Sequence, residues 1–342
     1  MPDIKREDIL RWLKSDDPGA LFAAADSERA ARFGNEVHIR GIIEFSNYCA
    51  CNCLYCGLRK GNGLVKRYRM SAGEIIDTAL GAIRHGYKTI LLQSGEDKAY
   101  GTDNLCAIIK RIKSESDCRI TLSLGELDFD EYKSLKDAGS DRYLLRFETS
   151  DRPLFKKLKP SCYDNRISCI KRLKSLGFQT GSGIMTGLPG QTYDTLCDDI
   201  LLMRELGLDM IGIGPFIPHP NTPLGNNVPG GLELALRVIA AARLALPLAH
   251  IPATTAIGTI AKDGIEKALK CGANVFMPDI TPPAFRSHYD IYPGKFCIGE
   301  NPLDSMARAK AMLERIGRYA SHNAGDAMAH AGDSVRGFKV NL

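Results

Sequence analysis

Residues 37–58 read VHIRGIIEFSNYCACNCLYCGL. The β-branched residues at the start of this stretch predict a strand over 37–45. The strand runs directly into a loop that holds four cysteines within eight residues, namely Cys49, Cys51, Cys53 and Cys56. A cysteine cluster placed at the end of a buried strand predicts a metal site, and the fold around it follows from the rest of the chain.

The same strand pattern recurs along the chain and alternates with helical patterns. Seven further strands are predicted at 88–93, 119–124, 142–147, 180–185, 209–216, 251–257 and 274–278. Eight strands that alternate with helices over about 240 residues predict an α/β fold, a closed parallel (β/α)8 barrel of the TIM type. The alternative is an open doubly wound sheet, but no glycine-rich phosphate loop follows the first strand.

The barrel pattern leaves a segment at each end of the chain. Residues 1–36 are predicted to form an N-terminal helical segment packed on the barrel, 37–302 the barrel itself, and 303–342 a C-terminal helix and tail. Within the barrel, Ser71 and Glu74 have the spacing of a capping box and predict the start of a helix. In a barrel of this kind the chemistry lies at the carboxyl ends of the strands, where the cysteines are.

Composition and charge exclude several classes of protein. The chain has 342 residues, is 44% hydrophobic and carries a net charge of +5. No basic block is interleaved with aromatic residues, so nucleic acid is not predicted as a partner. The N-terminus lacks an apolar signal core, and Arg243, Pro247, His250 and Pro252 interrupt the most apolar region, so neither export nor a membrane span is predicted. We therefore expect a cytoplasmic protein whose mild positive charge suits an acidic partner.

The spacing of the cysteines narrows the choice of metal site. Cys53 and Cys56 would supply half of a zinc site, but Cys49 and Cys51 are too tightly spaced for the other half. A redox pair formed by Cys53 and Cys56 would leave Cys49 unexplained. The remaining choice is the C-x3-C-x2-C set of Cys49, Cys53 and Cys56, which can hold three irons of a 4Fe–4S cluster and leave the fourth iron open. Cys51 is then the extra thiol.

With Tyr55 just before the last cysteine, this spacing resembles the signature of the radical S-adenosylmethionine (SAM) superfamily. The resemblance implies two cofactors, one 4Fe–4S cluster with three cysteine ligands and SAM, whose amino and carboxylate groups chelate the open iron. It also implies that one electron from the cluster cleaves SAM to methionine and a 5′-deoxyadenosyl radical.

A SAM site must also hold an ammonium group, a carboxylate, a ribose diol and an adenine. Ser94, Gly95 and Glu96 follow the second strand and resemble the family's glycine-glycine-glutamate motif, with Ser94 in place of the first glycine. Arg146 and Glu148 share one face of the fourth strand by its period of two. Glu148 is a candidate acceptor for the ribose hydroxyls, although a simple ion pair at the barrel mouth would also explain this pair.

Three further residues are candidates for the SAM site. Arg166 begins a helix after the fourth strand and could neutralise the methionine carboxylate, the alternative being a solvated helix arginine. Met185 and Gly187 lie in the stretch IMTGLPG (184–190), which turns tightly after the fifth strand and is a candidate to lie against adenine.

Segments across residues 37–297 more closely resemble the HydE family of FeFe-hydrogenase maturases. The segments, in order, are IEFSNYCACNCLYCGLRKGN, KRYRM, ILLQSGED, DRYLLRFET, MTGLPGQT, GIGPFIPHPNTPL, IPATTAIGT and YPGK. The resemblance implies radical chemistry on an iron–cysteine complex that carries carbon monoxide and cyanide and comes from the maturase HydG. It further implies a product that moves towards the maturase HydF, and reduced ferredoxin or flavodoxin as the electron donor.

The same resemblance implies the residues of an inner cavity: Ser94, Thr121, Arg146, Thr254, Thr255, Met277 and Tyr292. Hydroxyl groups and an arginine suit a carboxylate and a cyanide ligand. For the paired threonines, the preference of strands for β-branched residues is an alternative explanation.

The chain departs from one pattern within this family. Some HydE proteins hold a second cluster on three cysteines near the C-terminus, but here Cys297 stands alone, and Ser305 and Arg308 lie where the others would follow. We therefore predict no second cluster. This also counts against sulfur donation of the biotin synthase type, which needs an auxiliary cluster.

Two alternatives to a HydE-like maturase stay open at this point. One is another radical SAM reaction on a small molecule, such as a mutase of the methylornithine synthase type or a biotin-synthase-like enzyme. The other belongs to a different class, a non-catalytic iron–sulfur scaffold, which would have no need of a SAM pocket.

Overall fold

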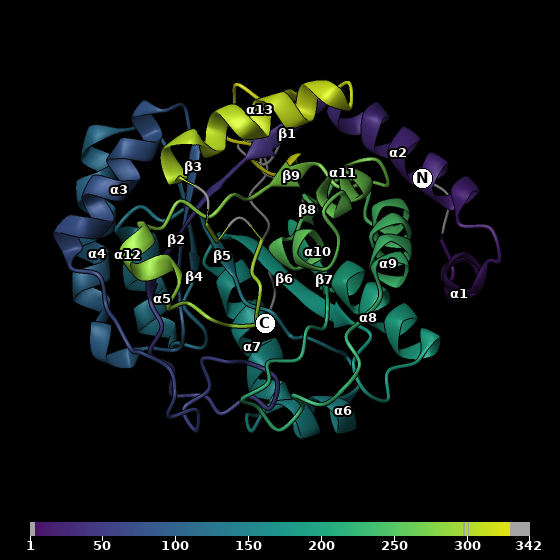
Figure 1. Cartoon of the computed structure of the whole chain (residues 1–342), viewed down its shortest axis with the longest axis horizontal. Coiled ribbons are helices and arrows are strands. Elements are labelled where there is room, and N and C mark those ends of the chain that lie inside the picture. The colour runs from purple at the N-terminus through teal and green to yellow at the C-terminus, as the bar shows by residue number, and fades with distance from the viewer. Residues whose placement is uncertain (1–3, 297, 300, 329–342) are drawn as a thin grey trace.

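The computed structural model describes residues 4–296, 298–299 and 301–328. Its strands are β1 (Glu36–Ile39), β2 (Gly41–Ser46), β3 (Thr89–Ser94), β4 (Arg119–Ser123), β5 (Arg142–Leu144), β6 (Gln179–Thr186), β7 (Met210–Pro215), β8 (Pro252–Ala253), β9 (Val275–Phe276) and β10 (Tyr319–Ala320). Figure 1 shows the strands near the centre of the molecule and the helices around them.

The α-helices are α1 (Arg6–Lys14), α2 (Gly19–Phe33), α3 (Ala72–Arg84), α4 (Thr102–Glu115), α5 (Phe129–Asp137), α6 (Arg152–Leu158), α7 (Tyr163–Ser175), α8 (Tyr193–Glu205), α9 (Leu232–Ala245), α10 (Thr255–Ile260), α11 (Gly264–Leu269), α12 (Pro283–Arg286) and α13 (Ser305–Arg315). Two short 3-10 helices are η1 (Lys98–Tyr100) and η2 (Pro302–Asp304). The predicted capping box forms at α3, where Ser71 N–H donates to Glu74 Oε2 at 2.7 Å.

The strands form a nearly closed parallel barrel, which confirms the predicted fold. Strands β2 to β7 are hydrogen-bonded in sequence order, and β8, β9 and β1 form a second parallel ladder. Two isolated parallel bridges, Met210 with His250 and Ile42 with Asp279, join the two sheets at both edges.

Several of the predicted strands are shorter or divided in the structure. The strand predicted over 274–278 forms only at Val275–Phe276. The strand predicted over 37–45 divides at Arg40, where the chain changes from pairing with β9 to pairing with β3. The strand predicted over 251–257 ends at Ala253, because Thr254 is the N-cap of the short helix α10. Regular pairing in β5 ends at Leu144, and Glu148 further on has a φ of 67°.

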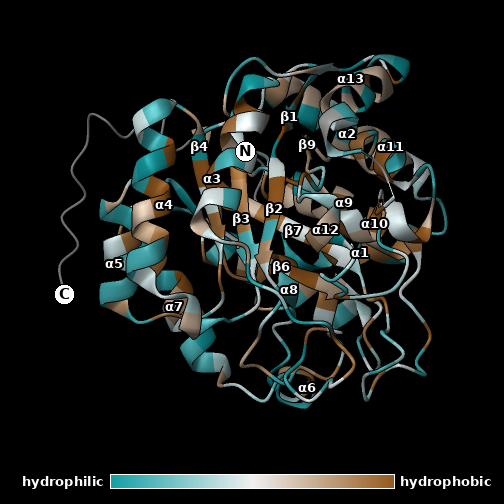
Figure 2. Cartoon of the chain, turned by 60° about the vertical axis from the view of Figure 1, so that its left-hand side comes forward, coloured by the Kyte–Doolittle hydropathy of each residue, from teal (hydrophilic) through white to brown (hydrophobic). Residues whose placement is uncertain are grey.

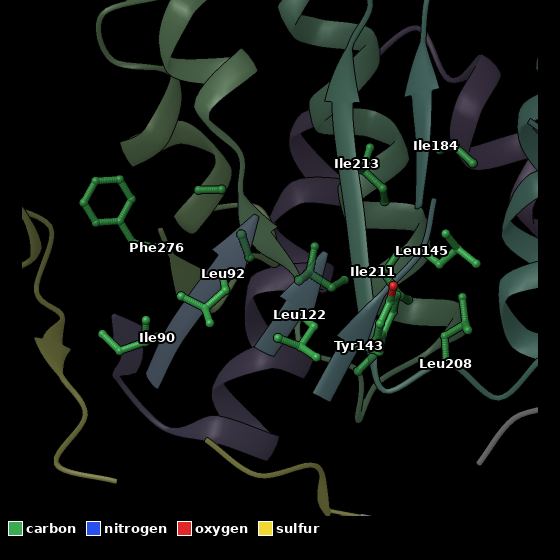
Figure 3. Packing of buried hydrophobic residues seen from close by; sticks show 14 of the residues in the cluster. Ile90, Leu92, Leu122, Tyr143, Leu145, Ile184, Leu208, Ile211, Ile213 and Phe276 are labelled. Carbon is green, nitrogen blue, oxygen red and sulfur yellow. The ribbon is translucent and has the colours of Figure 1, made fainter. Parts of the chain in front are cut away.

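Alternate residues of each strand face the helices and the barrel interior. Ile90 and Leu92 of β3 and Leu122 of β4 lie in the large hydrophobic cluster shown in Figure 3. Their neighbours Leu91 and Thr121 line an internal cavity instead. The strand period of two therefore builds a core under the helices and a separate lining for the site.

The N-terminal helices pack outside the barrel. α1 contacts α8 and α9, and α2 contacts α9, with Leu21, Ala25 and Ala240 buried between them. Figure 2 shows hydrophobic residues along central strands such as β3 and both hydrophilic and hydrophobic residues on the surrounding helices. Among the described residues no helix has both the length and the apolar character needed to cross a membrane.

The C-terminal segment covers the end of the barrel opposite the cysteine loop. β10 pairs with β1, and the chain beyond it meets the first residues of β4 and β5. Asp326 forms ion pairs of 2.8 Å with both Arg119 and Arg142, and Arg142 also donates to the Gly325 carbonyl. The part of the predicted tail that the structure describes is thus held against the barrel.

Candidate functional site

One cavity of about 350 Å³ runs through the barrel interior from the cysteine loop. All but one of the predicted site residues line it: Cys49, Cys53, Cys56, Tyr55, Ser94, Gly95, Glu96, Thr121, Arg146, Glu148, Arg166, Met185, Thr254, Thr255, Met277 and Tyr292. They come from segments more than 200 residues apart in the chain. Strand order brings them together, because the loops that follow parallel strands meet at one face of a barrel.

Gly187 is the one predicted residue that does not line this cavity. Its φ of 78° makes a tight turn after β6, and a side chain there would lie 2.5 Å from Gly230 Cα. Its N–H donates to Gln191 Oε1 at 2.8 Å. Gly187 is therefore placed to shape the loop, while Met185 two residues earlier reaches the cavity.

The cysteine loop is fixed by backbone hydrogen bonds to three other segments of the chain. Ala50 N–H donates to the Glu96 carbonyl, Leu54 N–H to Leu158 and Gly57 N–H to Ile291, each at 2.9 Å. Gly95 permits this packing, because a Cβ at that position would lie 2.2 Å from the Tyr48 carbonyl oxygen. The loop is preorganised by elements that precede and follow it in the barrel.

The loop gathers the thiols of Cys49, Cys51 and Cys53. Hydrogen bonding with Cys51 lowers the pKa of Cys49 to about 6 and that of Cys53 to about 7, and the same contacts raise the pKa of Cys51. Burial raises the pKa of Cys56 to about 12. Cys51, predicted to be the extra thiol, thus lies beside two of the predicted ligands.

These thiols do not converge on a single point. Among the residues that the structure describes, no group of three or more His, Cys, Asp or Glu side chains is arranged around one metal ion. A cluster in which each thiolate takes a different iron needs a wider arrangement than a single ion does. A cysteine-rich, partly desolvated loop, in which the pKa values of Cys49 and Cys53 are lowered, is a donor set that fits an iron–sulfur cluster. Cys297 lies outside the described residues.

A buried group of charges lies beside the cysteine loop. Arg166 on α7 is 2% exposed and pairs with Glu96 at 3.1 Å and with Glu126 at 2.7 Å. Despite its burial, these two carboxylates raise the pKa of Arg166, which keeps it charged. Arg166 is therefore not the solvated helix arginine that was the alternative to a site residue.

Arg146 and Glu148 form the predicted same-face pair. Arg146 Nε lies 3.0 Å from Glu148 Oε2, and the Tyr55 hydroxyl donates to Glu148 Oε1 at 3.4 Å. Glu148 is the only residue other than glycine with a positive φ among those the structure describes. Such a backbone costs about 1 kcal/mol or more, which the surrounding contacts must offset. The strained backbone turns this carboxylate toward the cavity that also holds Tyr55.

The inner part of the cavity offers polar atoms with unused bonding capacity. Thr121 Oγ1 is buried with no hydrogen-bond partner among the described residues. The Nε and Nη2 atoms of Arg146 bond to Glu148 and to the Ile184 carbonyl, so its Nη1 is the atom free for a ligand in this part of the chain. Thr254 Oγ1 donates to the Ile213 carbonyl at 3.2 Å and keeps its acceptor capacity.

Sequence reasoning missed a second group of buried charges in the cavity wall. Lys295 pairs with Glu44 and, at 2.8 Å, with Asp279, and Arg286 lies 3.7 Å from Asp279. Burial raises the pKa of Glu44, while Lys295 and Arg286 overcome burial and lower the pKa of Asp279. A glutamate inside the apolar strand IIEF was the available signal, since a buried acid needs a partner.

Lys159 was missed as well. It is the C-cap residue after α6, is 7% exposed and lines the cavity near Cys53 and Cys56. Arg40 and His250 line the far end of the same cavity, close to the C-terminal segment. Nothing in their local sequence separates these three residues from ordinary surface cations.

Comparison with known proteins defines the family. The model of the radical SAM superfamily matches residues 43–203. The chain is 49% identical over 320 residues to the [FeFe] hydrogenase maturase subunit HydE of Thermotoga maritima, covering 92% of each chain. The chain belongs to the radical SAM superfamily and, within it, to the HydE family. This confirms the resemblance that the sequence motifs indicated.

More distant relatives share the fold. The 3-methylornithine synthase of Methanosarcina acetivorans is 30% identical over 276 residues, which cover 79% of this chain and 78% of the relative. A solved structure of methylornithine synthase (PylB) superposes with a TM-score of 0.81 at 25% identity, covering 93% and 94% of the two chains. The maturase HydG superposes with a TM-score of 0.79 at 21% identity, covering 93% of this chain and 73% of HydG, which shows the fold alone.

Three properties of this chain follow from its membership of the HydE family. It is a radical SAM enzyme, its fold is the radical SAM barrel, and a 4Fe–4S cluster and SAM are its cofactors. A non-catalytic scaffold, the alternative from another class, does not fit a member of this family with the cavity described above.

Proposed function

We propose that the chain matures an FeFe-hydrogenase by acting on an iron–cysteine complex that carries carbon monoxide and cyanide. Two observations support this: its 49% identity with a HydE maturase over nearly the whole chain, and a cavity with cysteines at one end and Arg146, Thr121 and Thr254 deeper inside. The second carries most weight, because an anionic complex needs unused hydrogen-bond donors inside the cavity that binds it.

In this proposal Cys49, Cys53 and Cys56 hold the cluster, and Glu96, Glu148, Arg166, Met185 and Tyr55 surround SAM. When bound, the cluster supplies the single electron that cleaves SAM and yields the radical. The chain's own residues do the rest. Glu148 and Tyr55 accept and donate hydrogen bonds at the ribose, and the backbone around Gly95 faces the ammonium group.

In this proposal the inner end of the cavity binds and orients the iron–cysteine complex. Arg146 Nη1 and Thr121 Oγ1 donate to a carboxylate or cyanide nitrogen, and Thr254 and Thr255 add hydroxyl groups beside them. Met277 and Ser94 complete the wall, and Tyr292 covers it with a phenol whose pKa is raised by burial and therefore stays protonated.

A mutase reaction of the methylornithine synthase type is the second candidate. The 30% identity with 3-methylornithine synthase and the TM-score of 0.81 favour it among other radical SAM reactions. The two candidates differ in substrate. An amino acid carries an ammonium group that a buried carboxylate would have to match, whereas the iron complex carries no such group.

The assay of SAM cleavage under anaerobic conditions separates these candidates. The protein is reconstituted with iron and sulfide, reduced, and given SAM with or without the iron–cysteine–carbonyl–cyanide complex or an α-amino acid such as lysine. Stimulation of 5′-deoxyadenosine formation by the complex, with an adenosyl adduct on sulfur, supports the maturase. Stimulation by the amino acid alone supports the mutase and contradicts our proposal.

The partners of this proposal are the maturases HydG and HydF and an acidic electron donor such as reduced ferredoxin or flavodoxin. For the donor, the outer side of the cysteine loop offers a suitable face. Ala50 and Asn52 are exposed there, and Lys60, Lys156 and Lys157 are exposed with no ion pair among the described residues. Lys60 is held beside the loop because its backbone N–H donates to the Cys51 carbonyl at 2.8 Å. Lys156 and Lys157 lie just before Leu158, whose carbonyl accepts from Leu54 of the loop.

Reversing the charge of Lys60, Lys156 and Lys157 together to glutamate should slow cluster reduction by reduced ferredoxin about tenfold or more at low salt. Reduction by dithionite should not change, because dithionite needs no docking face. Stopped-flow absorbance measures both rates. Lys88→Glu with Lys270→Glu is the control, since both are exposed before β3 and β9 at the other end of the barrel. An equal loss in the control would contradict this docking face.

Replacing Glu148 tests the ribose contact separately from the fold. Glu148→Gly removes the carboxylate and relieves the φ of 67°, so we expect SAM affinity to fall about tenfold or more while the free energy of unfolding changes by less than about 1 kcal/mol. Glu148→Gln keeps the strained backbone and should weaken SAM as well. Iron content should stay at the wild-type value in both. Isothermal titration with SAM and chemical denaturation measure the two quantities, and unchanged affinity in both variants would rule out the contact.

A further inference from the structure

The backbone turn that carries Glu148 is closed by a hydrogen bond between its two neighbours. Thr149 N–H donates to the Phe147 carbonyl at 2.8 Å, and Glu148 between them has a φ of 67°. A hydrogen bond of this kind around a residue with positive φ defines the strained form of the γ-turn, which is rare in proteins. Such a backbone persists only where the surrounding contacts hold it.

Strand β6 holds one side of this turn. Glu148 N–H donates to the Gly183 carbonyl at 2.9 Å, and Met185 N–H donates to the Glu148 carbonyl at 3.2 Å. Because a parallel ladder suits extended backbone as well, these two hydrogen bonds alone do not select the turn.

The other side of the turn is held by Asp199 on α8. Asp199 Oδ1 accepts hydrogen bonds from the N–H of Ser150 and, at 2.6 Å, from the hydroxyl of Ser150, and it lies 3.5 Å from Thr149 Oγ1. Asp199 and Thr149 are both fully buried. One carboxylate oxygen thus gathers donors from both of the residues that follow Glu148.

A carboxylate at this place in the fold is costly. The neighbouring buried residues Leu196, Ile200 and Met203 of α8 are apolar. Asp199 Oδ2 is buried without a hydrogen-bond partner among the described residues, and burial raises the pKa of the Asp199 carboxyl group to about 7. An apolar side chain would avoid this cost, but only an acceptor such as the carboxylate can satisfy the donors of Thr149 and Ser150.

We infer that Asp199 positions Glu148 by holding Thr149 and Ser150 in the turn. The inference rests on the proposed contact between Glu148 and the ribose of SAM. Asp199 does not line the cavity, so it acts on SAM only through the Glu148 carboxylate. Its role is to keep that carboxylate directed at the ribose before SAM binds, because a preorganised group loses less conformational freedom on binding.

Asp199→Ala should raise the anaerobic dissociation constant of SAM about five- to tenfold, without exceeding the loss in Glu148→Gly. Iron content after reconstitution should match the wild type. Asp199→Asn keeps an oxygen that can accept from Ser150, so its dissociation constant should stay within about threefold of the wild type. Asp198→Ala is the matched control, since it removes the adjacent, exposed carboxylate, which pairs with Arg6 at 3.0 Å, and should leave SAM affinity unchanged. Isothermal titration measures these constants.

A double-mutant cycle with Glu148→Gly separates positioning from a general structural role. Glu148→Gly has neither a carboxylate to position nor a strained backbone, so adding Asp199→Ala to it should change the dissociation constant of SAM by less than about twofold. A residue that supported only the fold around SAM would cause the same loss in both backgrounds. Ser150→Ala removes one hydrogen bond to Asp199 and should show the same pattern with a loss of about threefold, which keeps the test open if Asp199→Ala does not fold.

Two results would overturn the role of Asp199 alone. One is wild-type SAM affinity in folded, iron-loaded Asp199→Ala, or in Ser150→Ala if Asp199→Ala does not fold. The other is an equal loss of affinity with and without the Glu148 carboxylate. Wild-type affinity in both Glu148→Gly and Glu148→Gln is a different pattern, and it would overturn the ribose contact on which this inference rests.

Discussion

Replacing Cys53 with alanine should abolish SAM cleavage, with the rate of 5′-deoxyadenosine formation falling below about a thousandth of the wild-type rate. Cys53 is 7% exposed at the inner side of its loop and shares a hydrogen bond with Cys51. If three thiolates hold three irons, removing one leaves two irons open, and the cluster becomes labile and unable to present one site to SAM. Iron content and product formation, measured anaerobically after reconstitution, test this directly.

Cys51→Ala is the matched control, because Cys51 lies in the same loop and in contact with two of the proposed ligands. It should retain a full cluster and cleavage within about threefold of the wild type. The outcome against our ligand assignment is the reverse pattern, in which Cys51→Ala loses the cluster and Cys53→Ala keeps it.

Lys295→Met should lower the free energy of unfolding by about 3–5 kcal/mol, the range observed when one partner of a buried ion pair is removed. Lys295 is 3% exposed and lies between the carboxylates of Glu44 and Asp279, which overcome its burial and raise its pKa. Without it, two buried carboxylates face each other with only Arg286 near Asp279. Chemical denaturation of the cluster-free protein measures the loss.

Two further variants show whether buried charge is the cause. Lys295→Met with Glu44→Gln should recover part of the lost stability, because the uncompensated charge on Glu44 is gone. Lys267→Met removes an exposed pair with Asp263 on α11 and should cost less than about 1 kcal/mol. A loss below about 1 kcal/mol in Lys295→Met would mean that this buried group does not stabilise the fold.

Local sequence was enough to predict the elements of the barrel. The buried-strand run KTILLQ, the strand RITLSL and the capping box of Ser71 and Glu74 depend on neighbours in the chain, and the structure confirms these elements. Predictions failed where distant contacts override local preference. IPATTAI has a strand composition, yet only Pro252–Ala253 pairs as β8, because the chain turns into α10 at Thr254.

Some features of the candidate site could likewise be predicted from local sequence, and others depend on contacts between distant residues. The cysteine spacing and the position of the loop after the first strand are local features, and they were sufficient to indicate the radical SAM superfamily, whose model matches residues 43–203. The partners of the buried charges are not local. Glu44 and Lys295 are 251 residues apart, and Arg166 meets Glu96 across 70 residues, so their pairing depends on the order of strands around the barrel.

The barrel, the cysteine loop and the family could all be inferred from the sequence, because periodicity, caps and motif spacing act over a few residues. Which charges are neutralised is a property of the folded chain alone. Arg166, a candidate for the SAM carboxylate by sequence, is paired with Glu96 and Glu126. The physical reason is that desolvation and ion pairing depend on what surrounds a side chain in space, which the barrel assembles from loops far apart in the chain.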